Sequence, residues 1–244
     1  MLRSTQPKST PDLAAKRARR VIAFDGDDTL WIDDSDEKRW ERDCKRLCGE
    51  HLPHPALADA FRRQVSAFGY TQQGVQRALL ESAREVCGGE VPAEWRADVD
   101  AVPGLIASLN LRFPPGLEHA LDRIGQNGHA LWIITMGDLV RQAIKLCCFP
   151  FLDRFDVVEI VERKDAASYM RILAMHGSAP SALTMVGDAF FEDVVPVARL
   201  GGRAVHVPEG HWKLLRPFGS LLPTRRIRVC RDIAEVPEVV AAGG

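Results

Sequence analysis

Two aspartates separated by one residue follow a short apolar run near the start of the chain. Residues 21–24 read Val-Ile-Ala-Phe, the pattern of a buried strand, and Asp25, Gly26 and Asp27 come directly after them. Side chains two positions apart in a strand point the same way, so we expect the carboxylates of Asp25 and Asp27 to aim at one spot. Like charges this close repel unless a cation or a shared proton compensates them. The pair therefore predicts a hard cation such as Mg²⁺ beside a carboxylate able to attack.

The elements that must position this pair follow from the periodicity of the rest of the chain. From Pro114 onward, helical and strand patterns alternate. We expect helices near 117–124, 138–147, 166–175 and 192–200, and strands near 130–135, 157–161, 182–186, 203–207 and 226–230. Alternation of this kind predicts an α/β fold with a doubly wound, mostly parallel sheet covered on both faces.

The segment between the first strand and this alternating part has a different pattern. Residues 33–111 look almost wholly helical and predict a bundle of about four helices. We therefore expect an α/β core formed by residues 21–32 and 112–244, with a helical domain, 33–111, inserted in it. Residues 1–20 are polar and end in a basic run, which predicts a flexible arm.

Polar side chains recur where the later strands end. Thr135 ends one predicted strand, Lys164 follows the next, and Gly187 and Asp188 end a third, with Asp193 five residues after Asp188. The carboxyl ends of parallel strands meet at one edge of a sheet, so these residues should gather near Asp25 and Asp27.

This set of residues resembles the four motifs of the haloacid dehalogenase-like superfamily of phosphohydrolases. The motif residues are Asp25-x-Asp27-x-Thr29, Thr135, Lys164 and Gly187-Asp188-x-x-x-x-Asp193. The resemblance covers essentially everything from Val21 to Val207, and the helical insert stands where that superfamily has its cap domain. Residues 24–31 and 200–208 are similar to a bacterial subgroup of small-molecule phosphatases. Asp28 stands where many members have glycine, and we give it no catalytic role.

The resemblance implies a Mg²⁺-dependent phosphatase that works through an aspartyl-phosphate. Asp25 would be the nucleophile, and Asp27 would donate a proton to the leaving oxygen and later take one from water. Asp25, the main-chain carbonyl of Asp27 and Asp188 would hold the metal, and Asp193 would steady Asp188 or a metal-bound water. Lys164 would hold the negative charge of the cluster in check and contact the phosphoryl group.

Two further groups of residues are candidates for holding the substrate. Thr135 would bind a phosphoryl oxygen, helped by the amides of Met136 and Gly137. Residues 69–74, with Tyr70, Gln72 and Gln73, form the best candidate for a cap loop that reaches into the cleft and reads the leaving group. An exposed connection between two helices is an equally good interpretation of that segment.

Three rival functions remain open at this point. A phosphomutase would use a sugar hydroxyl in place of water as the acceptor. A haloacid dehalogenase would use the same fold without a metal and lacks the second aspartate of the first motif, so Asp27 argues against it. A non-catalytic phosphate-binding protein is the third, and it would be expected to lose Asp25, Asp27 or Lys164.

Composition excludes some classes of partner. The 244 residues are 46% hydrophobic and 27% charged, as in an ordinary globular protein, and the formal net charge is −1. This balance gives no electrostatic case for nucleic acid or an anionic membrane surface, and no apolar stretch is long enough to span a bilayer. We expect a cytoplasmic protein whose partner is a small phosphorylated substrate; the oligomeric state is left open.

Overall fold

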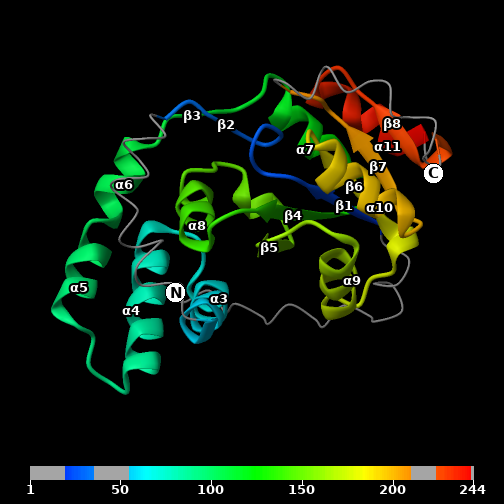
Figure 1. Cartoon of the computed structure of the whole chain (residues 1–244). Coiled ribbons are helices and arrows are strands. Elements are labelled where there is room, and N and C mark those ends of the chain that lie inside the picture. The colour runs from blue at the N-terminus through cyan, green and yellow to red at the C-terminus, as the bar shows by residue number, and fades with distance from the viewer. Residues whose placement is uncertain (1–19, 36–54, 210–223, 243–244) are drawn as a thin grey trace, which may run out of the picture.

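The computed structural model describes residues 20–35, 55–209 and 224–242. Its centre is a six-stranded parallel sheet (Figure 1). In sheet order, the strands are β5 (Val157–Val161), β4 (Ala130–Met136), β1 (Val21–Phe24), β6 (Leu183–Gly187), β7 (Arg203–His206) and β8 (Ile227–Val229). Since β1 lies between β4 and β6, the ends of these three strands lie side by side.

The central strands are buried on both faces. Along β1, Ile22 and Phe24 belong to one core cluster, whereas Val21 and Ala23 belong to a second cluster on the other face. A strand covered on both sides needs an apolar residue at every position. This is why a continuous apolar run, rather than an alternating one, precedes Asp25.

Helices cover both faces of the sheet. The cluster with Ile22 and Phe24 is completed by α7 (Leu117–Gln126), α8 (Leu139–Cys147) and α11 (Val236–Ala242), and the other cluster by α9 (Ala166–Met175) and α10 (Val195–Arg199). Short helical turns connect them: η2 (Leu152–Arg154), η3 (Pro180–Ala182), η4 (Phe190–Val194), η7 (Thr224–Arg226) and η8 (Ile233–Glu235). The predicted α/β fold with a doubly wound parallel sheet is confirmed.

A helical segment lies to one side of the sheet (Figure 1). It contains α3 (Pro55–Phe68), α4 (Gln72–Cys87), α5 (Ala93–Asp100) and α6 (Val102–Ser108), and α4 and α6 pack against α8. Two short antiparallel strands, β2 (Ile32–Asp33) and β3 (Leu111–Arg112), connect it to the sheet. The predicted boundaries at 33 and 111 therefore fall on a ribbon that helical periodicity did not reveal.

Parts of the sequence-based predictions lie outside the described residues. These are residues 1–19 of the predicted basic arm and residues 36–54 of the predicted insert. That the inserted helices form a cap domain stays a prediction. None of the described helices is long and apolar enough to cross a lipid bilayer.

The turn after β1 is tightly closed around Gly26. Its carbonyl accepts from the backbone amides of Leu30 at 2.8 Å and Trp31 at 3.1 Å. Trp31 is fully buried, and its indole packs edge-on against Phe149. A β-carbon at Gly26 would lie 2.4 Å from the Trp31 ring and 2.7 Å from Thr135 Oγ1. No side chain fits at this position without displacing its neighbours.

Asp28, the next residue but one, has a left-handed backbone with φ of 59°. Most residues with a β-carbon avoid this region, whereas glycine enters it freely and aspartate and asparagine tolerate it. The expectation that glycine is common at this position in related sequences therefore has a conformational reason. The Asp28 side chain is exposed.

Replacing Gly26 by alanine should destabilise the fold, because the added methyl group collides with a buried indole. We expect Gly26→Ala to lower the free energy of unfolding by about 1–3 kcal/mol, as overpacking of a filled core does. Urea unfolding followed by tryptophan fluorescence measures the change. Gly104→Ala is the matched control, since a β-carbon there meets nothing within 4 Å. An equal response of the two variants would contradict the proposed clash.

Candidate active site

A buried lysine holds two carboxylates together beyond the carboxyl end of β1. Asp25 follows β1, Lys164 follows β5, and Asp193 lies in the turn η4 after β6. Lys164 Nζ donates to Asp25 Oδ1 and, at 2.7 Å, to Asp193 Oδ1. All three side chains are buried. The order of the strands in the parallel sheet thus brings together residues that lie far apart in the sequence.

Asp188 completes an acidic cluster with Asp25 and Asp193. It follows β6, the strand beside β1, and carboxylate oxygens of the three aspartates lie within 4.8 Å of one another. The backbone carbonyl of Asp188 accepts a hydrogen bond of 2.8 Å from His206 Nε2 at the end of β7. Gly187 makes room for the cluster, because a β-carbon there would lie 2.1 Å from Asp193 Oδ2.

Burial and mutual repulsion raise the pKa values of these carboxylates. Burial, together with the charges of Asp193 and Asp27 and against the opposing effect of Lys164, raises the pKa of Asp25 to about 7. Burial and the negative charges of Asp25 and Asp193 raise the pKa of Asp188 to about 8. Burial alone would lower the pKa of Lys164, but Asp193 and Asp25 outweigh it and raise that pKa. The site is short of positive charge.

The donor set of the cluster suits a hard divalent cation. Three ionised carboxylates and one ammonium leave a net charge of −2, and all the candidate ligand atoms are oxygens. The two oxygens of Asp193 already accept from Lys164 Nζ and, at 3.1 Å, from the Ala189 amide. Asp25 and Asp188 are therefore the carboxylates best able to ligate a metal directly, and Asp193 the one best able to support it.

Asp27 does not point to the same spot as Asp25, which corrects the expectation from strand alternation. β1 ends at Phe24, so the regular alternation of side chains does not continue through Asp27. Its carboxylate faces α8 and accepts from Lys145 Nζ at 2.5 Å, Gln142 Nε2 at 2.7 Å and Trp31 Nε1 at 3.0 Å. Three donors hold this carboxylate in place, while its side chain stays 35% exposed.

Gln142 and Lys145 are site residues that sequence reasoning missed. Both are buried, and Lys145 Nζ also forms an ion pair of 3.0 Å with Asp33 at the start of the β2–β3 ribbon. A signal for them was present: Asp138, Gln142 and Lys145 follow a helical spacing of four and three residues and, with Arg141, make a polar stripe on a helix whose other residues are mostly apolar. A buried stripe of this kind on the helix after Thr135 points toward the site.

Thr135, the last residue but one of β4, has a hydroxyl without a partner among the described residues. The residue is fully buried, and among the described residues Thr135 Oγ1 has no hydrogen-bond partner. Buried polar atoms without a partner are rare, so this hydroxyl is available to a ligand. The Gly137 amide differs from expectation, because it donates to the Val161 carbonyl at 3.0 Å and so already has an acceptor. Met136 is exposed beside it.

The candidate cap residues are not brought to the acidic cluster. Gln72 and Gln73 begin helix α4, capped by the Thr71 side chain, and are exposed. Tyr70 packs against the core near Glu159 and Cys147, and burial raises the pKa of its hydroxyl. Residues 69–74 are therefore a short connection between α3 and α4 followed by the start of α4, which is the second of the two interpretations of this segment.

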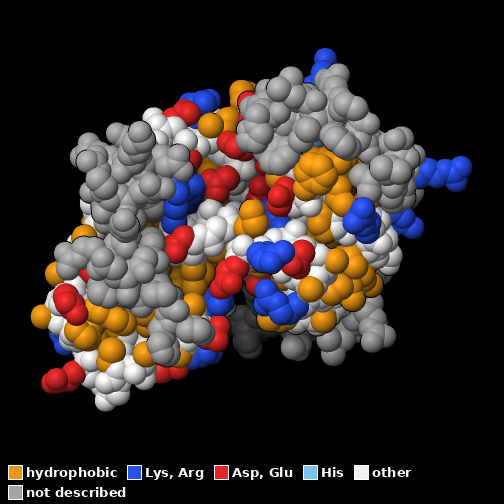
Figure 2. Space-filling view, in the orientation of Figure 1, with side chains coloured by type: hydrophobic (Ala, Val, Ile, Leu, Met, Phe, Trp, Pro, Cys, Tyr) orange, Lys and Arg blue, Asp and Glu red, His pale blue; other side chains and the backbone are white. Residues whose placement is uncertain are grey.

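Acidic side chains gather on the surface above this site. Figure 2 shows Asp and Glu side chains in the upper centre of the face in view, over the region where β1 ends in Figure 1. Partial desolvation in the turn after β1, together with the charges of Asp27 and Asp25, raises the pKa of the neighbouring Asp28. Any ligand that approaches here meets a negative field unless a cation is bound.

Several solved structures with a similar fold are described as haloacid dehalogenase-like hydrolases, dehalogenases or phosphatases. A haloacid dehalogenase-like family hydrolase from Xanthomonas campestris is 24% identical, with a TM-score of 0.54, over 98% of this chain and 94% of that one. A 2-haloacid dehalogenase from Pseudomonas syringae is 20% identical, with a TM-score of 0.52, over 93% and 100% of the two chains. A predicted phosphoglycolate phosphatase from Haemophilus somnus is 16% identical, with a TM-score of 0.52, over 91% and 98%.

At these identities the likeness shows the fold, and the predicted resemblance is confirmed at that level. The chain has the fold of the haloacid dehalogenase-like hydrolases. The sequence matches no protein-family model, and the search of curated proteins gave no match. Since the structural neighbours are named both as phosphatases and as dehalogenases, the chemistry must come from the residues of this chain.

Removing the ammonium of Lys145 should destabilise the protein, because Asp27 and Asp33 both lose their shared cation. We expect Lys145→Met to lower the free energy of unfolding by about 1–3 kcal/mol, the usual cost of leaving a partly buried charge without its partner. Chemical denaturation measures this. Arg171→Met, an exposed basic residue on α9, is the control and should change stability by less than about 0.5 kcal/mol. If Lys145→Met behaves like the control, the ammonium does not hold the two carboxylates.

Proposed function

We propose that this protein is a Mg²⁺-dependent phosphomonoesterase that acts on a small phosphorylated metabolite. The observation that carries the proposal is the arrangement around Asp25. A buried carboxylate lies against Lys164 and beside Asp188, with Asp27 two residues further on and held separately by α8. This provides a nucleophile, a cation site and a second carboxylate for proton transfer, each in its own environment.

The reaction would proceed in two displacements at phosphorus. In the first, an Asp25 carboxylate oxygen forms a bond to phosphorus, the bond from phosphorus to the leaving oxygen breaks, and Asp27 gives that oxygen a proton. In the second, water attacks the aspartyl-phosphate, Asp27 takes a proton from the water, and phosphate leaves with Asp25 regenerated. The hydrogen bonds from Lys145, Gln142 and Trp31 would hold the Asp27 carboxylate in one orientation through both displacements.

Other residues would orient the phosphoryl group. Lys164 lies against Asp25 and can offer positive charge to a phosphoryl oxygen, and the unpartnered Thr135 hydroxyl can donate to another. With the Gly137 amide already bonded, Thr135 carries more of this role than the sequence-based prediction gave it. Asp193 would keep Lys164 in position by accepting a hydrogen bond from its ammonium group.

Asp25, Asp188 and the main-chain carbonyl of Asp27 would hold the Mg²⁺. When bound, the metal supplies positive charge that neutralises the carboxylates and polarises the phosphoryl group. A nucleophile with a pKa raised to about 7 is ionised only in part at neutral pH, so a cation beside Asp25 would also favour its reactive form.

Dehalogenation is the alternative chemistry, because the Pseudomonas protein of similar fold is named as a dehalogenase. Both reactions would begin with attack by Asp25, so the nucleophile does not distinguish them. The distinguishing residue is Asp27. A halide leaves without a proton, so its release would not use Asp27 as a proton donor. The network that positions Asp27 therefore favours an oxygen leaving group.

Replacing the nucleophile should abolish turnover while the fold persists. We expect Asp25→Asn to reduce phosphate release from an aryl phosphate in the presence of Mg²⁺ by at least about 10³-fold, because an amide is a poor nucleophile. Asp28→Asn is the control, since this exposed neighbour also loses one charge and asparagine tolerates its left-handed backbone.

Chloride release from 2-chloropropionate, assayed in the same preparations, tests the alternative. Phosphate release that survives in Asp25→Asn would contradict the covalent route. Chloride release without phosphate release would replace the phosphatase proposal by the dehalogenase one.

Metal binding should stabilise the fold more strongly at higher pH. Between the ordinary carboxyl pKa of 3.8 and the raised values of about 7 for Asp25 and 8 for Asp188, the metal-free folded state binds protons that the unfolded state lacks. Stability of the metal-free protein therefore falls as pH rises through this range. Mg²⁺ competes with those protons, so it should raise the melting temperature more at pH 8 than at pH 6.

Differential scanning calorimetry at both pH values measures this. A hundredfold excess of Mg²⁺ over its dissociation constant should raise the melting temperature by about 5–10 °C. Asp188→Asn should show a much smaller rise, whereas Asp153→Asn, an exposed acidic residue far from the cluster in sequence, should respond as the wild type does. An equal rise in all three would remove Asp188 from the metal site.

A further inference from the structure

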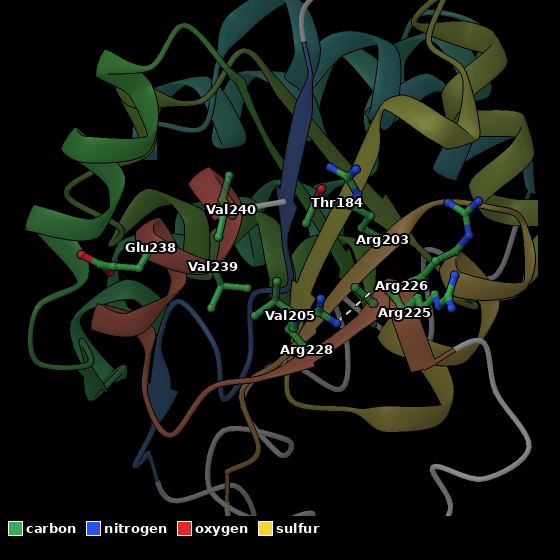
Figure 3. Close-up of a pocket in the computed structure, with 11 residues that line it drawn as sticks. Thr184, Arg203, Val205, Arg225, Arg226, Arg228, Glu238, Val239 and Val240 are labelled. Carbon is green, nitrogen blue, oxygen red and sulfur yellow. Dashed lines mark hydrogen bonds between the residues drawn. The ribbon is translucent and has the colours of Figure 1, made fainter. Parts of the chain in front are cut away.

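A second pocket lies at the opposite edge of the sheet from the acidic cluster. It has a volume of about 520 Å³ and is formed by the amino ends of β6, β7 and β8 together with α11 (Figure 3). Thr184 lies near the amino end of β6, and Arg203 is the first residue of β7. The strands themselves separate this pocket from Asp25 and Asp188, which follow their carboxyl ends.

The register of the sheet explains which side chains face this pocket. Thr184 pairs with Arg203, and Val205 pairs with Arg228 of β8. Paired residues project to the same face of a sheet, as do residues two apart, so all four lie on the face that α11 covers. The pocket is therefore a product of the fold rather than of a loose surface loop.

The pocket is rich in guanidinium groups. Arg203 comes from β7, Arg225 and Arg226 from the turn η7 before β8, and Arg228 from β8. Burial and the positive charges of Arg20, Arg226 and Arg228 lower the pKa of Arg203. Like charges are gathered here at an energetic cost to the folded protein.

The described residues supply little compensation. Across residues 20–35, 55–209 and 224–242, no carboxylate forms an ion pair with Arg203 or Arg225. The acidic residue of the lining, Glu238, forms an ion pair with Arg123 of α7 instead, and in Figure 3 it points away from the arginines. Arg226 has a backbone acceptor, the Gly201 carbonyl at 2.6 Å.

The other side of the pocket is apolar. Val239 and Val240 of α11 face Val205 of β7, and Figure 3 shows the two valines on one side of the view and Arg203, Arg225 and Arg226 on the other. The Thr184 side chain lies between them. A ligand that satisfied both sides would need an anionic end and an apolar end.

We propose that this pocket is an anion-binding site for a small phosphorylated compound that carries an apolar group. Guanidinium groups bind phosphate oxygens through paired hydrogen bonds, and the volume is that of a site for a small organic molecule. The site is separate from the acidic cluster and does not depend on the proposed phosphatase activity. A ligand here would relieve the repulsion among the arginines and so stabilise the folded state.

Protection of individual arginines tests the proposal on the unmodified protein. Phenylphosphonate is the probe, because it joins a phosphoryl dianion to an apolar ring and cannot be hydrolysed at a phosphate ester. In Mg²⁺-free buffer of constant ionic strength, it should slow the modification of Arg203 and Arg225 by phenylglyoxal, mapped by mass spectrometry. The exposed Arg171 of α9 should react at an unchanged rate. Methylphosphonate, which lacks the ring, should need about tenfold higher concentration for equal protection.

Calorimetric titration of variants tests the same site by affinity. Arg203→Gln/Arg225→Gln should bind phenylphosphonate at least about tenfold more weakly than the wild type, and Arg171→Gln should bind it equally well. Without Mg²⁺, the acidic cluster carries net negative charge and repels the probe, so binding reports on the arginines. Aryl phosphate hydrolysis in the presence of Mg²⁺ should be unchanged in all these variants, whatever activity the wild type has.

Three results would overturn the proposal. One is protection of all arginines alike, which would indicate general screening. Another is equal affinity in the double variant and the wild type, with unchanged unfolding curves. The third is equal protection by methylphosphonate and phenylphosphonate, which would remove the apolar half of the site.

Discussion

The ammonium group of Lys164 is the interaction on which the candidate active site depends. It lies between Asp25 and Asp193, two carboxylates that would otherwise repel each other in a buried setting, with Asp188 close by. One cation cannot neutralise three anions, so the site is neither a satisfied ion-pair network nor an ordinary core. The remaining negative charge suits the hard cation that we propose for this site, and the raised pKa values of Asp25 and Asp188 have the same cause in part.

The rest of the fold can be understood as the scaffold for that one contact. Asp25, Lys164 and Asp193 come from three separate crossovers of a parallel sheet, and only the order β5-β4-β1-β6 brings their strand ends to one edge. Apolar residues on both faces of β1 fix the strand, and Gly187 leaves the space that the Asp193 carboxylate fills. Stability and site geometry thus share the same residues.

The sequence allowed the fold class and the position of most site residues to be predicted, for a local reason. The motif residues lie at or shortly after the carboxyl ends of apolar strands, and parallel strands bring these ends to one edge of the sheet. The orientation of Asp27 could not be predicted in this way, because it is decided by Gln142 and Lys145 on a helix distant in sequence. The β2–β3 ribbon could not be predicted for another reason: a strand of two residues is too short to show a periodicity. The glycines and polar side chains of residues 69–74 are compatible both with a loop that reaches the site and with a connection between helices, so the sequence did not decide between them. The structure has the connection, with Thr71 capping the helix that begins at Gln72.

The ion pairs of Lys145 connect Asp27, the residue proposed to transfer protons, with the ribbon that leads to the inserted helices. One ammonium bonds Asp27, in the turn beyond β1, and Asp33, in the ribbon that carries the chain toward α3–α6. A hinge movement of that ribbon would therefore pull on the same ammonium that fixes Asp27. A substrate that shifted the helices when it bound would therefore change the orientation of Asp27 before any bond was broken. Lys145 would then couple substrate recognition to proton transfer by Asp27.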